Sequence, residues 1–270
     1  ILACRNMDKA QAAEAEIQVD IPQAQTEIMA LDLNSLDSVH QFATKFKQQY
    51  DRLDILVNNA GIMMVPYGTT EDGFEKQLGV NHLGHFALTG LLMDVILNTP
   101  GARVVNISSN AHQRGEMDFE DLMYEKKDSY TPNGAYGRSK LANILFTKEL
   151  QRRFQEMGAD AMALAAHPGL SNTNLADHMF DNRAAQLLRP LADKLLPSAY
   201  MGALPTLRAA VDPEAQGGDY FGPDGFNSMR GYPIKIEPNP AAQNIADAQK
   251  LWQVSEELTG VSFLEFEPVL

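Results

Sequence analysis

Tyr136 and Lys140 are the two residues of this chain best suited to acid–base chemistry. Their spacing of four places both side chains on one face of a helix, about one turn apart. A free tyrosine has a pKa of about 10 and exchanges protons poorly at neutral pH, whereas a neighbouring ammonium favours the phenolate and lowers that pKa. We therefore predict that Tyr136 donates or accepts a proton and that Lys140 lowers its pKa.

Four other short motifs give this pair its context, because a tyrosine and a lysine four residues apart also arise by chance. Apolar runs lead into three of these motifs, as expected for parallel strands whose carboxyl ends carry a binding site. The motifs are NNAG at 58–61, NHLGHF at 81–86, VVNISS at 104–109 and HPG at 167–169.

The VVNISS motif ends in two serines, Ser108 and Ser109. A hydroxyl at this strand end can hydrogen-bond a substrate carbonyl oxygen that becomes an alkoxide, and so stabilise the developing charge. We assign this role to Ser109, with Ser108 as the alternative.

The NHLGHF motif contains two histidines three residues apart, His82 and His85. Such a pair can in principle share a metal ion, but the spacing suggests no third ligand. We therefore predict no metal site and interpret both histidines as packing or surface residues.

Together, the five motifs in this order resemble the short-chain dehydrogenase/reductase family. More narrowly, ACRN near the start, VNISS followed by a long insert, and AYGRSKLANILFTKEL resemble its retinol dehydrogenase-like branch. The resemblance implies an α/β fold, a Rossmann-type doubly wound parallel sheet in three α/β/α layers. It also implies that the family's first strand, glycine-rich loop and first helix are missing before Ile1. We expect a chain truncated at its N-terminus by roughly 20 to 40 residues, the size of a βα unit with its loop.

The resemblance further implies reversible hydride transfer between a nicotinamide dinucleotide and a carbonyl or alcohol substrate. In the family, Asn81 holds a water that links the lysine to bulk solvent, which suits an asparagine placed inside the helix predicted over 71–98. Tyr136 and Lys140 also contact the cofactor, Lys140 through the ribose hydroxyls. A non-catalytic nucleotide-binding sensor or scaffold with the same fold is the alternative.

Arg5 follows the apolar run ILAC, which we interpret as the end of a buried strand. An arginine at the carboxyl end of that strand can bind the 2′-phosphate of NADP, whereas an acidic residue would bind the ribose hydroxyls of NAD. NADP(H) is therefore favoured and NAD(H) is possible. The alternative for Arg5 is an ordinary surface arginine.

The resemblance also places Asp32 at the adenine amino group and Leu33 beside the adenine ring. The alternative for Asp32 is a residue that begins the turn into the helix from Ser35. In NNAG, Asn58 either braces the strand ends or contacts the cofactor.

Ala60 and Gly61 are expected nearer to the cofactor than Asn58. After the strand that ends at HPG, the resemblance places four residues against the nicotinamide and the pyrophosphate: Pro168, Gly169, Leu170 and Thr173.

Two segments are candidates for the substrate end of the site. The polar, turn-rich segment 112–134, here called the insert, separates VVNISS from Tyr136, and we expect it to form a loop over the substrate. The segment 175–197 is either a substrate lid or a helix that packs on the core.

Length, charge and cysteine content set the remaining expectations. A chain of 270 residues suits a single dinucleotide-binding domain over residues 1–270. A formal net charge of -13 with scattered basic residues argues against a nucleic-acid partner. The single cysteine, Cys4, excludes an internal disulfide and suits a reducing compartment, and no apolar run reaches membrane-spanning length. We therefore expect a cytoplasmic protein. The resemblance favours a homodimer or homotetramer that acts on a small-molecule carbonyl or alcohol, and it leaves open whether that is a retinoid, a steroid, a small aldehyde or a xenobiotic.

Overall fold

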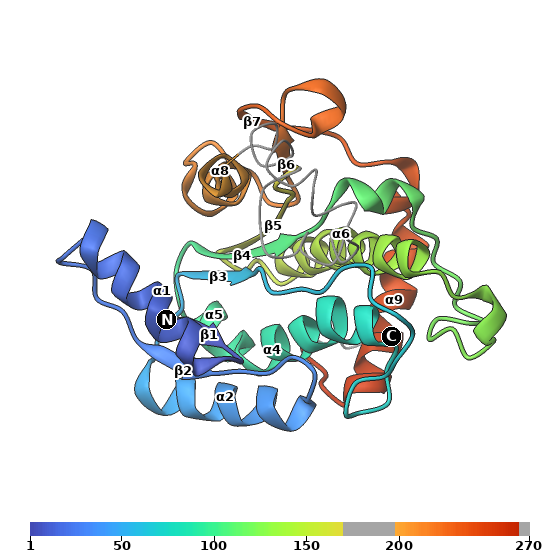
Figure 1. The fold of residues 1–270 in the computed structure, drawn as a ribbon, viewed down its shortest axis with the longest axis horizontal. Coiled ribbons are helices and arrows are strands. Elements are labelled where there is room, and N and C mark those ends of the chain that lie inside the picture. The colour runs from blue at the N-terminus through green and yellow to red at the C-terminus, as the bar shows by residue number, and fades with distance from the viewer. Residues whose placement is uncertain (170–197, 265–270) are drawn as a thin grey trace, which may run out of the picture.

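The computed structural model describes residues 1–169 and 198–264, and it shows strands flanked by helices (Figure 1). The main sheet has five strands in the order β3-β4-β5-β6-β7, of which the first four are parallel and β7 is antiparallel. These strands are β3 (Ile55–Asn58), β4 (Ala102–Ile107), β5 (Ala161–Ala166), β6 (Tyr220–Pro223) and β7 (Pro233–Lys235). The predicted α/β architecture with a mostly parallel sheet is confirmed.

Two further parallel strands, β1 (Leu2–Cys4) and β2 (Ile28–Ala30), form a separate sheet. Among the described strands, none lies between β1 and β3, so one edge of β3 carries unpaired backbone groups. Ile55 and Val57 on β3 are correspondingly exposed at 39% and 37%. The described strands thus form two sheets, β1-β2 and β3 to β7, as expected for a Rossmann-type sheet whose first strand is missing.

Most predicted helices occur where their capping residues and apolar stripes suggest. α1 (Met7–Asp20) begins at Asn6, whose side chain accepts a hydrogen bond from the Lys9 N–H. α2 (Leu36–Gln49) buries an apolar stripe of Val39, Phe42, Ala43 and Phe46. In the described residues, the remaining long helices are α6 (Pro132–Glu156), α8 (Ala199–Val211) and α9 (Ile245–Thr259), and the short 3₁₀ segments are Asn110–Arg114, Lys127–Ser129, Phe226–Ser228 and Pro240–Gln243.

The single helix predicted over 71–98 is wrong, because four shorter segments replace it: α3 (Lys76–Leu78), a π-helical turn (Gly79–Leu83), α4 (Gly84–Leu91) and α5 (Met93–Leu97). The Glu75 carboxylate accepts hydrogen bonds from the Gln77 and Leu78 N–H groups, so the helix begins five residues late. The π turn coincides with Asn81, whose side chain bonds to the backbone of Ile62 rather than to its own helix.

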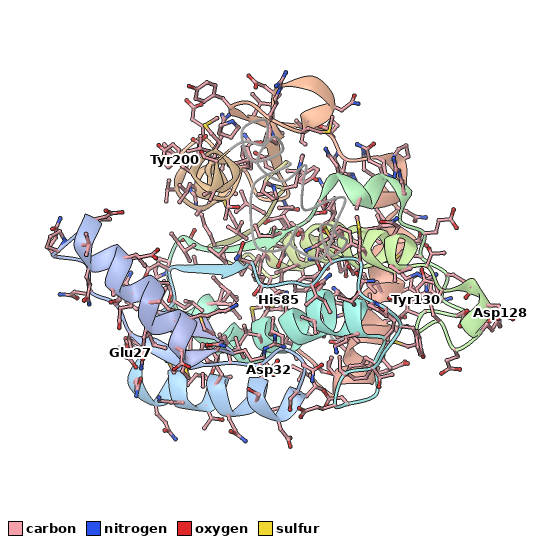
Figure 2. All side chains as sticks on the ribbon, in the orientation of Figure 1. Glu27, Asp32, His85, Asp128, Tyr130 and Tyr200 are labelled. Carbon is pink, nitrogen blue, oxygen red and sulfur yellow. The ribbon has the colours of Figure 1, made fainter. Side chains whose placement is uncertain are left out.

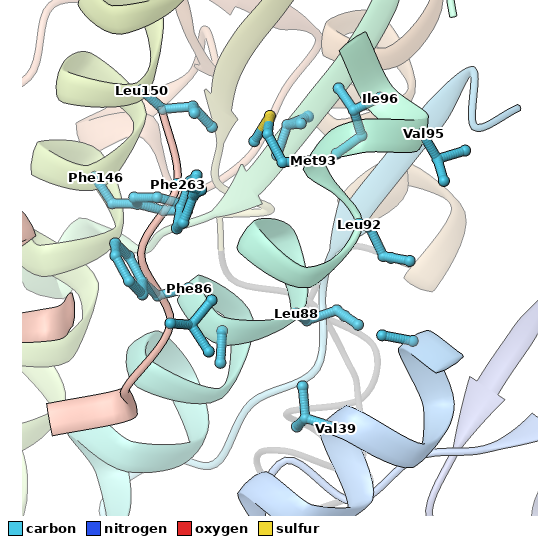
Figure 3. Close-up of a cluster of buried hydrophobic side chains, with 14 of the residues drawn as sticks. Val39, Phe86, Leu88, Leu92, Met93, Val95, Ile96, Phe146, Leu150 and Phe263 are labelled. Atoms are coloured by element: carbon cyan, nitrogen blue, oxygen red, sulfur yellow. The ribbon is translucent and has the colours of Figure 1, made fainter. Parts of the chain in front are cut away.

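The alternation of side chains along β4 divides the core into two layers. Ala102 and Val104 face a large cluster built with α2, α4, α5 and α6, part of which Figure 3 shows. Val105 and Ile107 face a second cluster that includes Ala209 of α8. Helices therefore cover both faces of the main sheet, with α8 on one side and α4 to α6 on the other (Figure 1).

α9 packs against α6 and α4 through the only tryptophan of the chain, Trp252, which is 1% exposed. Its ring contacts Phe86, Phe146 and Phe263 at centroid distances of 5.1, 5.8 and 4.5 Å. Arg153 of α6 lies over the same ring at 4.1 Å.

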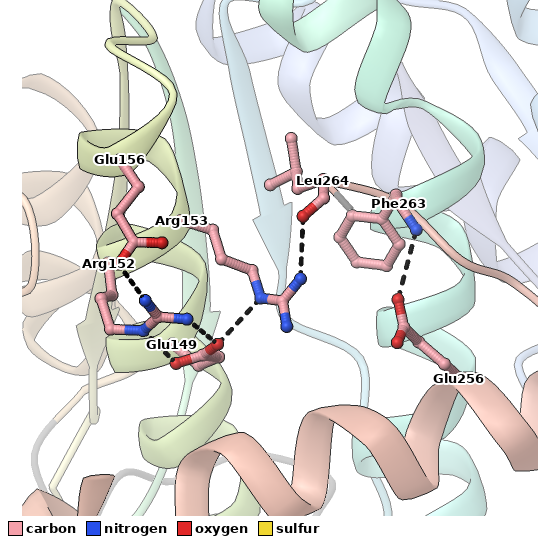
Figure 4. Close-up of polar contacts among 7 residues, drawn as sticks. All are labelled: Glu149, Arg152, Arg153, Glu156, Glu256, Phe263 and Leu264. Atoms are coloured by element: carbon pink, nitrogen blue, oxygen red, sulfur yellow. Dashed lines mark hydrogen bonds and ion pairs between the residues drawn. The ribbon is translucent and has the colours of Figure 1, made fainter. Parts of the chain in front are cut away.

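Polar contacts fix the segment that follows α9 (Figure 4). Arg153 Nη1 donates to the Leu264 carbonyl at 2.8 Å, and Arg153 Nε donates to Glu149 at 2.8 Å. The Phe263 N–H donates to the Glu256 carboxylate at 3.4 Å. Together with Trp252, these contacts hold Phe263 and Leu264 against α6 and α9.

No helix in residues 1–169 and 198–264 combines the length and the apolar character that a membrane crossing needs.

We expect the substitution Trp252→Ala to lower the free energy of unfolding by about 3 to 5 kcal/mol, because it empties the centre of an aromatic cluster. Ile245→Ala on the same helix is the control; Ile245 is 65% exposed, so its loss should cost no more than about 0.5 kcal/mol. Urea denaturation followed by circular dichroism measures both. Equal effects of the two substitutions would contradict the packing described here.

Candidate active site

A cleft of about 560 Å³ opens where β3, β4 and β5 end, beside α8. Several residues predicted to bind the cofactor or to react line this cleft: Ala60, Gly61, Tyr136, Lys140 and Pro168. The walls also include Ser108 and Asn59. The structure therefore brings residues from four distant motifs into one cavity.

Tyr136 and Lys140 lie on one face of α6, as their spacing predicted. Tyr136 is 5% exposed, and the Lys140 ammonium lies 5.7 Å from the centre of its ring. Tyr136 shares a hydrogen bond with the Ser109 side chain, whereas the Ser108 hydroxyl donates to the Lys140 carbonyl at 2.8 Å. Ser108 lines the cleft and is bonded to the helix backbone, so the choice between Ser109 and Ser108 as the substrate-orienting hydroxyl stays a prediction.

The pKa of Tyr136 shifts in the direction opposite to the one predicted from the sequence. Burial raises the pKa of the phenol, and the hydrogen bond with Ser109 opposes this rise. Lys140 is buried too, and desolvation lowers its pKa to about 8, while its ammonium donates to the Ile107 carbonyl at 3.1 Å. In this structure Tyr136 is therefore a neutral phenol at neutral pH and a weaker acid than a free tyrosine, and Lys140 loses its proton more readily than a free lysine.

Asn81 holds two parts of the site together. Its Oδ1 accepts from the Ile62 N–H at 2.8 Å, and its Nδ2 donates to the Ile62 carbonyl and to Ser139 Oγ, both at 2.9 Å. Ser139 in turn donates to the Tyr136 carbonyl at 2.8 Å. The amide of Asn81 thus connects the loop after β3 with the helix that carries Tyr136.

Gly61 forms the wall of the cleft next to this connection. A Cβ atom at position 61 would lie 3.0 Å from Asn81 Oδ1 and 3.5 Å from Lys140 Nζ. Its φ lies outside the positive range that favours glycine, so backbone angles do not explain this residue. The glycine is needed because two functional side chains approach its backbone closely.

Asn58 uses its side chain to brace the sheet. Its Nδ2 donates to Asn106 Oδ1 at 2.8 Å and to Thr89 Oγ1 at 3.1 Å, and Asn106 donates to Thr147 at 3.0 Å. The bracing interpretation therefore accounts for this side chain, and any cofactor contact by Asn58 stays a prediction.

Arg5 and Asp32 come together at the ends of β1 and β2, with Arg5 Nη1 4.0 Å from Asp32 Oδ1. Asp32 also begins a turn, because its Oδ1 accepts from the Asn34 N–H at 2.9 Å, as the alternative interpretation proposed. Leu33 is buried in the core against Gly84. The cofactor roles of Arg5, Asp32 and Leu33 stay predictions.

The HPG motif turns sharply after β5. Gly169 has a φ of 71°, a conformation that favours glycine, and its N–H donates to His167 Nδ1 at 3.1 Å. Leu170 and Thr173, and the segment 175–197, lie outside the described residues. Their roles stay predictions.

Sequence reasoning missed two contributions to the site. Asn143, one turn after Lys140, donates to the Ile107 carbonyl at 2.9 Å, the same carbonyl that accepts from Lys140. In the sequence, only the position of Asn143 in the run SKLAN, three residues after Lys140, pointed to this contact. The wall formed by α8 was also missed: Ala199, Gly202, Ala203 and Thr206 recur at helical spacing and line the cleft. Small residues at such a spacing were the available signal.

The insert is held to α6, rather than to the described part of the cleft. Arg138 donates to the backbone carbonyls of Glu116, Asp121 and Leu122 at 3.0, 2.7 and 2.9 Å. Its guanidinium lies 3.9 Å from the centre of the Tyr124 ring. None of the described residues of the insert lines the cleft, so its predicted place over the substrate is not supported.

We expect Lys140→Met to gain stability relative to the wild type at about pH 7 and to lose that advantage at about pH 10. The pKa of Lys140 is about 8 in the folded protein and 10.5 without the protein environment, so between these values the unfolded chain binds more protons. Below pH 8 the buried ammonium therefore lowers the free energy of unfolding of the wild type by its largest amount. This destabilisation disappears as the pH rises toward 10.5, a change of up to about 3 kcal/mol.

Urea denaturation of both proteins at the two pH values measures this difference. Lys45→Met is the control, because Lys45 is exposed and its ammonium stays in water on folding. A difference between Lys140→Met and the wild type that does not change with pH would contradict the burial of a charged group.

Known proteins resemble this chain in sequence and in fold. A model of the short chain dehydrogenase family matches residues 1–122. Human retinol dehydrogenase 13 is 41% identical over 266 residues, which cover 97% of this chain and 77% of that protein. Human retinol dehydrogenase 12 is 40% identical over 260 residues, covering 96% and 78%.

Solved structures give the same result. The crystal structure of an uncharacterised protein from Mycobacterium paratuberculosis has a TM-score of 0.77 and 41% identity, covering 97% of this chain and 84% of that chain. RhlG of Pseudomonas aeruginosa, solved with NADP, has a TM-score of 0.58 at 20% identity over 81% of this chain and 82% of that chain, a likeness of fold alone. The chain therefore belongs to the short-chain dehydrogenase/reductase family, in its retinol dehydrogenase-like branch, and is an oxidoreductase.

Proposed function

We propose that this enzyme transfers a hydride between NADP(H) and a carbonyl or alcohol substrate, with Tyr136 as the proton donor and acceptor. The observation that carries the proposal is the pair of Tyr136 and Lys140 at the cleft, with the ammonium 5.7 Å from the centre of the phenol ring and Ser109 beside the phenol just after β4. Each of the three groups has a distinct chemical task there.

The residues of the cleft fit a nicotinamide dinucleotide. The Lys140 ammonium has three donors, and the Ile107 carbonyl accepts one of them in the described structure, so ribose hydroxyls can accept others. The absence of a side chain at Gly61 lets a ligand approach the backbone beside this ammonium. When bound, the nicotinamide supplies or accepts the hydride.

The chain's own residues manage the charge that develops on the substrate oxygen. Ser109 donates a hydrogen bond to that oxygen, and Tyr136, a neutral phenol at about pH 7, gives it a proton. The nearby ammonium of Lys140 stabilises the resulting phenolate. Asn81 keeps the loop after β3 and α6 in the arrangement that these steps need.

An apolar alcohol or aldehyde is the substrate class we favour. α8 contributes small and apolar side chains to the cleft, among them Ala199, Ala203 and Leu207. The relatives are named retinol dehydrogenases, and retinol is an apolar alcohol. Retinal and NADPH are therefore the probes to try first.

We expect Tyr136→Phe in the full-length protein to reduce turnover at least about 100-fold while NADPH binding stays within about threefold, because only the proton donor is lost. Turnover is followed by NADPH absorbance and binding by calorimetry. Tyr200→Phe, which alters an exposed hydroxyl on α8, is the control. Undiminished turnover by Tyr136→Phe would remove the phenol from the mechanism.

We expect Arg5→Ala to weaken NADPH binding about tenfold or more and NADH binding less than about threefold, because only NADP carries the 2′-phosphate that a guanidinium can bind. Arg52→Ala is the matched control, since Arg52 is paired with Asp54 at the start of β3. Equal losses for the two cofactors would contradict a preference for NADP set by Arg5.

A further inference from the structure

A histidine just after the π-helical turn Gly79–Leu83 hydrogen-bonds to the turn, and no role has been assigned to this bond so far. His85, the second residue of α4, is 4% exposed and lies in the interior of the molecule (Figure 2). Its Nδ1 lies 3.0 Å from the carbonyl oxygen of Asn81, one turn earlier. The imidazole therefore contacts the backbone of the residue whose amide connects two parts of the active site.

The chemistry of this contact fixes the tautomer of His85. A carbonyl oxygen can only accept, so Nδ1 carries the proton and Nε2 is unprotonated. The ring stays neutral, since burial lowers the pKa of His85 to about 4 and the nearby charge of Lys140 acts in the same direction. His85 is thus a fixed hydrogen-bond donor.

The contact leads to Lys140 through a short chain of described interactions. The Asn81 amide bonds both the N–H and the carbonyl of Ile62, so the orientation of Asn81 sets the position of that backbone. Gly61, which precedes Ile62, approaches both Asn81 Oδ1 and Lys140 Nζ. A rotation of the Asn81 peptide would therefore move the cleft wall beside the ammonium.

We propose that His85 is a positioning residue. Its Nδ1–H donates to the Asn81 carbonyl and thereby fixes the Asn81 amide, the backbone at Gly61 and the Lys140 ammonium relative to one another. This inference rests on the proposed function, because Lys140 is given a catalytic role there. It departs from the sequence-based interpretation of His85 as a packing or surface residue.

His82 provides an internal comparison on the same segment. It is equally buried, but its Nε2 lies 2.9 Å from Ser255 Oγ of α9. Since the Ser255 hydroxyl donates to the Leu251 carbonyl at 2.7 Å, His82 must donate from Nε2. The two histidines therefore use opposite nitrogens: His82 donates from Nε2 to Ser255 of α9 and also contacts Asn143, and His85 donates from Nδ1 to the Asn81 carbonyl.

Three substitutions at position 85 test the proposal in the full-length protein. An asparagine places an N–H near the position of Nδ1, a glutamine places one near Nε2, and a leucine has neither. We measure kcat and KM for retinal with NADPH, or with NADH if the wild type uses it, together with the melting temperature. His82→Leu is the control.

We expect His85→Leu and His85→Gln to lower kcat about tenfold or more with KM nearly unchanged, and His85→Asn to recover kcat to within about threefold of the wild type. His82→Leu should lower the melting temperature while kcat changes less than about threefold. If His85→Leu does not fold, the contrast between asparagine and glutamine decides the question.

The proposal is overturned if His85→Asn is as slow as His85→Gln, or if all three variants keep the wild-type kcat and lose only thermal stability. A wild-type protein without turnover on either cofactor, by contrast, defeats the proposed function itself.

Discussion

The burial of the Lys140 ammonium is the constraint on which the rest of the site depends. A charged group taken out of water must be compensated by hydrogen bonds or by a partner, or else it loses its proton. Here the Ile107 carbonyl supplies one acceptor, and the same carbonyl accepts from Asn143. The end of β4, the helix α6 and the loop at Gly61 must therefore all lie next to the Lys140 ammonium to hold it at the wall of the cleft.

Polar side chains, rather than apolar packing, make these elements meet. Asn58 and Asn106 connect β3, β4 and two helices, and Asn81 connects the loop after β3 with α6. Each of these amides is buried and has both donor and acceptor atoms, so it can join backbone or side-chain groups from two elements at once. Apolar contacts alone would leave the relative position of these elements less closely defined.

Much of this arrangement could be predicted from the sequence. The period of four at Tyr136 and Lys140 and the apolar runs before NNAG, VVNISS and HPG are local signals, and the structure reproduces the helix and the strands that they predicted. The rest depends on contacts between distant residues. The π-helical turn at Asn81 comes with hydrogen bonds to the distant Ile62, the raised pKa of Tyr136 follows from burial by the whole fold, and β7 is a three-residue strand that pairs with β6.

The anchoring of the insert by Arg138 bears on how this branch of the family can diversify. The guanidinium binds three backbone carbonyls, and backbone groups are present whatever the side chains are. Most side chains of the insert can therefore be substituted without loss of these hydrogen bonds, provided that the backbone follows the same path. Because Arg138 shares its helix with Tyr136, new surfaces can be presented to the surroundings while the reacting groups stay where they are.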